Sequence, residues 1–110
     1  MNEQNTKIAN MYNLTEKIEK LEKDMLSIPH VTDIDFDLNG FLDNMHQVII
    51  IIGYKYSNAD MSSYATQIRN LKTNIINTAK KHGLTRTEDT LEDYGTHLYI
   101  VFNHDNTWLK

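Results

Sequence analysis

Apolar residues recur every three or four positions along the first quarter of the chain, with lysine and glutamate between them. They are Ile8, Met11, Leu14, Ile18, Leu21 and Met25. This spacing places all of them on one side of a helix, so the pattern predicts an amphipathic helix over residues 6–28. Pro29 disfavours helical geometry at Ile28, which predicts the end of the helix there.

The spacing of the apolar residues then changes from a period of about 3.6 residues to a period of two. Aspartates alternate with apolar residues over residues 31–38, which predicts a half-buried strand. Asn39 and Gly40 predict a turn, and residues 47–56 form an apolar run that does not alternate. Such a run is typical of a strand that is buried on both faces, so we expect a hairpin with this strand inside the sheet.

The second half of the chain shows the same two periods. Residues 61–79 carry an apolar stripe at helical spacing, preceded by polar capping residues and followed by lysines and a glycine. Residues 84–91 predict a polar strand, and residues 97–104 predict a second strand that is apolar on both faces. Trp108 lies in a short tail.

The predicted order is helix, strand, strand, helix, strand, strand. It matches the ferredoxin-like order βαββαβ after its first strand is moved to the end. We therefore expect a single α+β domain over residues 1–110, with a four-stranded antiparallel sheet and two helices on one face. The alternative is a three-layer α/β/α fold, in which the first helix or the Trp108 tail covers the opposite face. No motif is specific enough to name a protein family.

The sheet face without helices would present four large apolar side chains at its centre. They are Ile49, Ile51, Tyr99 and Val101. Full burial of each is worth about 1.5–3 kcal/mol, or about 6–12 kcal/mol together, which approaches the stability of a whole domain. The pattern therefore predicts that a second copy, making a homodimer, or another protein covers this face, unless the chain covers it itself.

Composition narrows the class of protein. The chain has 110 residues, a net charge of −4 and no cysteine, and its apolar runs are too short to span a membrane. We expect a cytoplasmic protein without disulfides, without a membrane association and without a secretory signal in its first 30 residues. Lysine outnumbers arginine nine to two, which is typical of low-GC bacteria and their viruses.

Acidic residues form a regular row on the first strand. Asp33, Asp35 and Asp37 would be spaced ~6.6–6.8 Å apart, so they could imitate a nucleic-acid backbone and occupy a basic channel on another protein. The alternative is that these charges only prevent edge-to-edge aggregation. The acidity of the chain argues against direct binding of DNA or RNA.

Two polar groups could carry chemistry at the ends of the sheet. At one end we expect His46, His82 and His104 near Asp105, but their spacing fits no metal motif and we predict no metal site. At the other end we expect three tyrosines and two histidines beside residues 57–63, where capping is favoured over anion binding. These five are Tyr54, Tyr56, Tyr94, His30 and His97.

No catalytic or phosphate-loop motif occurs in the chain, so we predict neither an enzyme nor a cofactor. The sequence favours a non-enzymatic protein-binding module that associates with itself through the open sheet face. Two alternatives remain. One is a virus- or mobile-element-encoded, anti-CRISPR-like inhibitor of a host nucleic-acid-processing defence system, acting as an acidic mimic through Asp33, Asp35 and Asp37. The other is a ligand-binding or enzymatic dimer whose pocket is lined by His97, Tyr99 and Tyr54.

Overall fold

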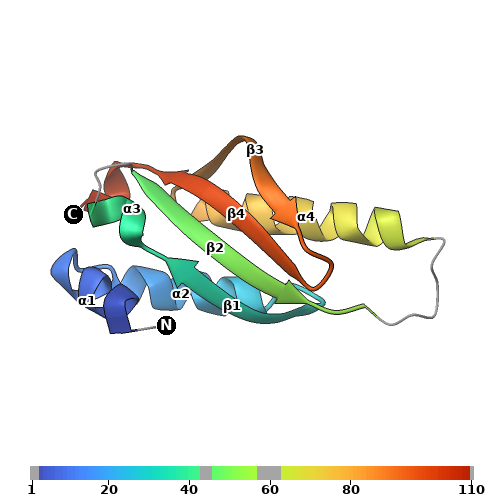
Figure 1. Cartoon of the computed structure of the whole chain (residues 1–110), viewed down its shortest axis with the longest axis horizontal. Coiled ribbons are helices and arrows are strands. Elements are labelled where there is room, and N and C mark those ends of the chain that lie inside the picture. Colours follow the sequence, from blue (N-terminus) through green and yellow to red (C-terminus); the bar gives the residue numbers. More distant parts are fainter. Residues whose placement is uncertain (1–2, 43–45, 57–62, 110) are drawn as a thin grey trace.

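The computed structural model describes residues 3–42, 46–56 and 63–109. The chain is an α+β protein with an antiparallel sheet, as the sequence predicts (Figure 1). The sheet order is β1-β2-β4-β3, which places β2 and β4 in the middle. The elements are α1 (Glu3–Met11), α2 (Thr15–Leu26), β1 (Val31–Asp37), α3 (Asn39–Leu42), β2 (Gln47–Tyr54), α4 (Tyr64–Lys81), β3 (Leu84–Asp93), β4 (His97–His104) and the 3-10 helix η2 (Asn106–Leu109).

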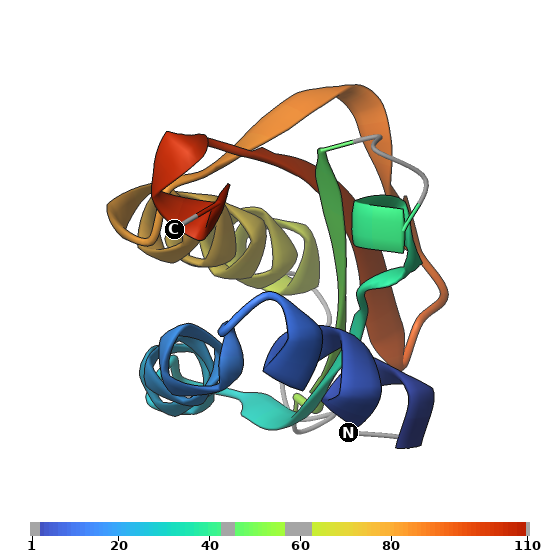
Figure 2. The same cartoon turned by 90° about the vertical axis from the view of Figure 1, so that its left-hand side faces the viewer.

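The helices α2 and α4 lie on the same side of the sheet (Figures 1 and 2). Their apolar stripes meet six side chains of the central strands, and all six have no exposed surface. They are Val48, Ile50, Ile52, Leu98, Ile100 and Phe102. The three-layer alternative is therefore wrong, because α2 buries its stripe in the same core as α4.

The tail does not cover the opposite face either. Trp108 is fully buried beside Phe41, with ring centroids 6.2 Å apart, and its Nε1 donates a hydrogen bond to the carbonyl oxygen of His82 at 2.6 Å. These contacts hold η2 against the end of α4.

The single helix predicted over residues 6–28 is wrong, because the chain forms two helices there. The break follows Met11, and Asn13 adopts the left-handed backbone conformation with φ 58°. Asparagine tolerates this conformation better than most residues. The turn exposes 66% of Met11 while Leu14 stays buried, so the two positions no longer share one face.

The turn predicted at Asn39 and Gly40 is instead the start of the short helix α3. The backbone N–H of Asn39 donates to the Asp37 carboxylate at 3.0 Å, which begins the helix. The buried Asn5 of α1 holds the same corner, because its amide donates to the carbonyl oxygen of Phe36 and accepts from the N–H of Leu38. Together α1, α3 and η2 close one end of the core.

Within the part of the chain that the structure describes, no helix is long and apolar enough to cross a lipid bilayer.

Candidate functional site

The free face of the sheet has an apolar centre. The antiparallel register of β2 and β4 pairs Ile49 with Val101 and Ile51 with Tyr99, and the two-residue period turns all four side chains away from the helices. We call these four residues the apolar stripe. β2 and β4 run across the middle of the view in Figure 1 with no helix in front of them.

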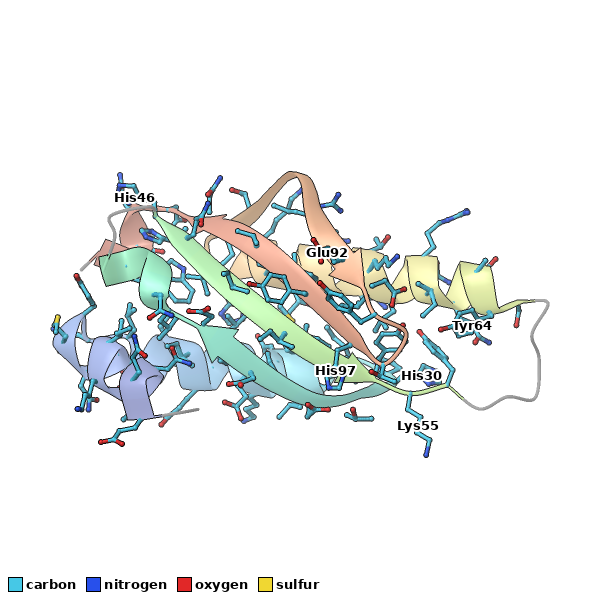
Figure 3. The ribbon with its side chains drawn as sticks, viewed as in Figure 1. His30, His46, Lys55, Tyr64, Glu92 and His97 are labelled. Carbon is cyan, nitrogen blue, oxygen red and sulfur yellow. The ribbon has the colours of Figure 1, made fainter. Side chains whose placement is uncertain are left out.

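Carboxylates border the apolar stripe on both sides. On β1, Asp37 pairs with Ile49, Asp35 with Ile51 and Asp33 with Gly53, so the three aspartates follow one edge of the stripe. On β3, Glu92 pairs with Tyr99 and lies along the other edge (Figure 3). The structure thus brings together all seven residues that the sequence predicts for partner binding, and it adds Glu92 to them.

The aspartates are held mainly by neighbouring donors of their own strand and turn. Asp35 accepts from the backbone N–H of Phe36 at 2.9 Å, and Asp33 accepts from the Thr32 hydroxyl at 2.7 Å. Among the described residues, one basic group forms an ion pair with the row. It is His97, whose Nε2 lies 3.7 Å from Asp33. Most of the negative charge of the row is therefore not neutralised by an ion pair.

Gly53 gives Asp33 its place. A Cβ atom at residue 53 would collide with the Asp33 carboxylate, which leans over the strand at that point. Only glycine leaves this space, so the position of the first aspartate depends on a residue of the neighbouring strand.

The electrostatics of the stripe agree with this arrangement. Burial raises the pKa of the Tyr99 hydroxyl, and the carboxylates of Asp37 and Glu92 raise it further. Both carboxylates act on a hydroxyl in the middle of the face. The negative charge at the borders of the face is therefore felt at the Tyr99 hydroxyl.

The apolar stripe is less exposed than the sequence alone implies. All four side chains are half-buried, although no helix covers them. The full burial energy of about 6–12 kcal/mol is therefore an upper limit, and a partner would gain only part of it. The stripe remains the apolar centre of a surface with charged borders, which is the usual anatomy of a protein interface.

The histidines at the other end of the sheet do not form a common site. The rings of His46 and His104 lie 5.2 Å apart, but His104 stacks on Phe41 at 4.6 Å and His82 bonds to Asp24 of α2 at 2.6 Å. Among the residues that the structure describes, no three histidine, aspartate or glutamate side chains could hold a metal ion together.

Two of the three tyrosines at the far end bond to other elements of the fold. Tyr54 donates to Asp93 at 2.5 Å and Tyr56 donates to the carbonyl oxygen of Gln67 at 3.0 Å. The rings of Tyr56 and His30 also contact each other, with centroids 4.1 Å apart and planes tilted by 31°. Most of the segment expected as an anion site, residues 57–62, lies outside the described residues. Tyr94 extends from the turn with 64% of its surface exposed.

The pocket expected from His97, Tyr99 and Tyr54 cannot include Tyr54. Tyr54 is buried on the helix side of the sheet, whereas the other two residues point to the open face. Residues an odd number of positions from the stripe point away from it, so Tyr54 could not line a pocket there.

Comparison of the chain with protein-family models, with curated proteins and with solved structures finds no match.

Proposed function

We propose that the protein is a non-enzymatic binding module whose open sheet face docks another protein. The observation that carries the proposal is the apolar stripe between Asp33, Asp35 and Asp37 on one side and Glu92 on the other. Apolar contacts in the centre would supply affinity, and the carboxylates would select the partner.

The charge pattern favours a partner with basic residues around an apolar centre. Opposite charges across an interface speed association and exclude wrong partners, whereas like charges facing each other are costly. The borders of the face hold three aspartates and a glutamate, and within the part of the chain that the structure describes the one basic group paired with them is His97, beside Asp33. A partner surface with lysine or arginine at matching positions fits this face.

A second copy of the chain fits the face less well when its strands are aligned with those of the first. A two-fold axis along the strands would place β1 of one copy over β3 of the other, and an axis across the strands would place β1 over β1. Both arrangements bring the aspartate row opposite carboxylates. The homodimer expected from the sequence would therefore have to form against charge repulsion.

The aspartate row also supports a more specific form of this function, inhibition of a nucleic-acid-processing system. Asp33, Asp35 and Asp37 alternate along one strand and form no ion pair with lysine or arginine among the described residues. A row of unneutralised charges at regular spacing is what a basic nucleic-acid channel attracts. Such a partner would bind this protein and nucleic acid competitively.

We also infer that the fold is a circularly permuted ferredoxin-like arrangement. The sheet order β1-β2-β4-β3 supports this relation, because moving the first ferredoxin-like strand to the end of the chain produces the same order. The division of the first helix into α1 and α2, and the presence of α3, are additions to that scheme.

The function is tested by capture and rebinding. The wild-type chain captures its partner from a native lysate, the partner is purified, and its affinity is measured for a variant with Asp33→Asn, Asp35→Asn and Asp37→Asn. We expect binding at least about tenfold weaker, with a smaller difference at high salt. The matched control carries Glu3→Gln, Glu19→Gln and Glu22→Gln, which change the net charge equally on the helices.

Sedimentation separates the possible occupants. A strict monomer at tens of micromolar with aspartate-dependent binding of a basic protein is the expected result. A stable dimer lost on Ile51→Asp would show that a second copy occupies the face. Equal weakening by both charge variants would contradict a role for the sheet face.

A further inference from the structure

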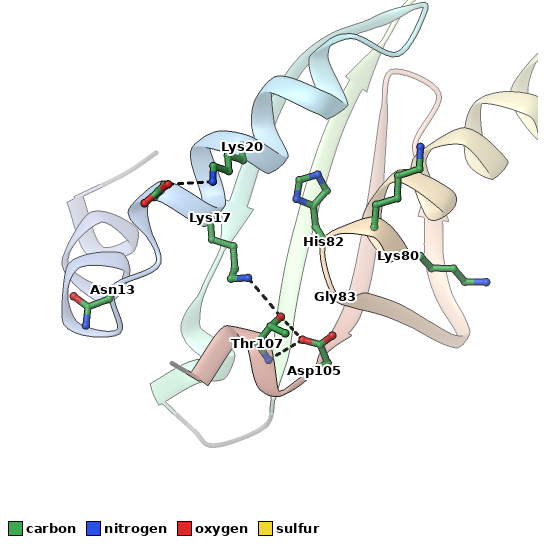
Figure 4. A pocket seen from close by; sticks show the side chains of 10 residues that line it. Asn13, Lys17, Lys20, Lys80, His82, Gly83, Asp105 and Thr107 are labelled. Atoms are coloured by element: carbon green, nitrogen blue, oxygen red, sulfur yellow. Dashed lines mark hydrogen bonds and ion pairs between the residues drawn. The ribbon is translucent and has the colours of Figure 1, made fainter.

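A second surface, on the helix side of the molecule, has the opposite charge. A pocket of about 560 Å³ lies between the start of α2, the end of α4 and η2 (Figure 4). Four lysines line it, two from each of the long helices. They are Lys17, Lys20, Lys80 and Lys81.

Most of this positive charge is not neutralised. Lys20 forms an ion pair with Glu16 at 3.0 Å. The ammonium of Lys17 instead lies 3.5 Å from the Thr107 hydroxyl and 5.3 Å from the centre of the Trp108 ring. Within residues 3–42, 46–56 and 63–109, no carboxylate forms an ion pair with Lys17, Lys80 or Lys81.

The remaining acidic and ionisable groups of the pocket have other partners. Asp105 accepts hydrogen bonds from the backbone N–H and the hydroxyl of Thr107, and these bonds, with Lys17 nearby, lower its pKa. His82 bonds to Asp24 at 2.6 Å. The lining thus carries four ammonium groups against the carboxylates of Asp105 and Glu16, so the pocket keeps a net positive charge in a chain whose net charge is −4.

Helix electrostatics explain only half of the cluster. Lys80 and Lys81 lie at the C-terminal end of α4, where the helix dipole favours cations. Lys17 and Lys20 lie in the first half of α2, where the dipole favours anions. Leu14 at the N-cap gives α2 no side-chain cap, so the amides of its first turn add to the positive potential.

The pocket continues along the groove between α2 and α4. Lys81 also lines a second pocket of about 490 Å³, whose other lining residues are mostly uncharged hydrogen-bonding groups. These include Ser27, Asn74, Asn77 and Thr78. Asp24, whose carboxylate bonds to His82, also lines this second pocket, so the groove has a cationic end and a polar end.

We propose that the cationic end binds the phosphate groups of a small phosphorylated metabolite, with its polar body directed along the groove. Lysine ammonium groups are point charges that bind phosphate without requiring one orientation. The volume falls in the range of small-molecule sites, about 300–1,000 Å³. Serine, threonine and asparagine side chains offer donors and acceptors to hydroxyl or base groups. This site is independent of the sheet face.

The single tryptophan gives a local readout, because Trp108 lies directly under Lys17. The probes are inorganic pyrophosphate and fructose 1,6-bisphosphate, with sodium chloride at equal ionic strength as the blank. We expect a saturable change in Trp108 fluorescence with both probes, and tighter binding of the sugar bisphosphate. Lys17→Gln with Lys81→Gln should weaken binding at least about tenfold, as measured by calorimetry.

Controls separate a site from general attraction. Lys7→Gln with Lys55→Gln removes the same charge away from the pocket and should leave binding unchanged. Equal weakening by both double variants, or no saturation up to about 10 mM pyrophosphate, would overturn the proposal. Tighter binding of a short single-stranded oligonucleotide than of either probe would overturn the small-molecule assignment. Thermal unfolding of each variant confirms that it is folded.

Discussion

The two faces of the sheet are built from the same central strands but differ in how deeply their side chains are buried. On the helix side, Ile50 and Ile100 have no exposed surface, whereas on the open side their neighbours Ile51 and Val101 are only half-buried. The residues on the edge strands differ in the same sense. Phe36 of β1 joins the core, and Asp35 and Asp37 beside it border the open face.

This difference shows that an apolar run in a central strand does not by itself reveal how deeply each face is buried. Ile49, Ile50, Ile51 and Ile52 are chemically identical and occupy alternate faces. The two faces differ because the helices cover one of them, whereas the side chains of the other have only their neighbours within the sheet. The carboxylates at the borders stay hydrated and disfavour non-specific association of the uncovered face with other sheets.

The largest expected difference between the faces is in stability. Ile50→Ala should lower the free energy of unfolding by about 2–5 kcal/mol, because it opens a cavity in the core. Ile51→Ala should cost about 1 kcal/mol, because its side chain already contacts water. Urea unfolding of the two variants measures both values. Equal losses would mean that the open face is as well packed as the core.

A smaller effect is expected where the edge strand β3 is fixed to the core. Tyr54→Phe should cost about 1–2 kcal/mol, because it removes the hydrogen bond to Asp93. Tyr94→Phe is the matched control, since Tyr94 is exposed in the turn after β3 and its hydroxyl, which bonds to Glu92, should matter little. Urea unfolding at neutral pH compares them, and similar losses would contradict the structural role of Tyr54.

The stability that the hydrogen bond between Tyr54 and Asp93 contributes should depend on pH in a defined direction. Burial raises the pKa of Asp93, but hydrogen bonds from Tyr54 and Gly95 and the ammonium of Lys72 outweigh it, so the net pKa lies below 3.8. A depressed pKa adds stability at neutral pH that is lost as the pH falls through the folded value. The advantage of the wild type over Tyr54→Phe should therefore shrink in acid, and an advantage that grows there would contradict this assignment.

The smallest stability effect is expected on the open face. Replacing Asp33, Asp35 and Asp37 with asparagine should change the free energy of unfolding by no more than about 0.5 kcal/mol per site. Asparagine keeps the oxygen that accepts the backbone N–H groups of Phe36 and Asn39, and it removes repulsion within the row. Thermal unfolding checks this, and a large loss would show that the aspartates stabilise the fold itself.

The strands could be predicted well from the sequence, because their side-chain periods are strong. The strand expected over residues 97–104 coincides with β4, and the one expected over 31–38 differs from β1 by one residue. The face assignment of the aspartates and the stripe follows from the same two-residue period.

The first helix could not be predicted correctly, because its apolar spacing continues through the break. Leu14 and Ile18 stay in step with Ile8 although the chain turns between them. Asn13 was the available signal, since asparagine is common in left-handed turns. The extension of β3 to Asp93, which places Glu92 on the open face, depends on a register shift between Arg86 and Leu91 that no local pattern reveals.

The lysine pocket also could not be predicted from the sequence. Its two pairs of lysines are more than fifty positions apart, and only the packing of α2, α4 and η2 brings them around one space. The burial of Trp108 in that packing could not be expected from its place in a short tail.

The four lysines of the pocket lie on the helix side of the molecule and the carboxylate borders lie on its open side, so these two groups of charges form a dipole across the sheet. The electric field of a highly charged partner or surface would orient such a molecule before the two make contact. A positively charged surface would meet the sheet first, and a negatively charged one would meet the helices. The direction of approach is thus encoded in the chain before any specific contact forms.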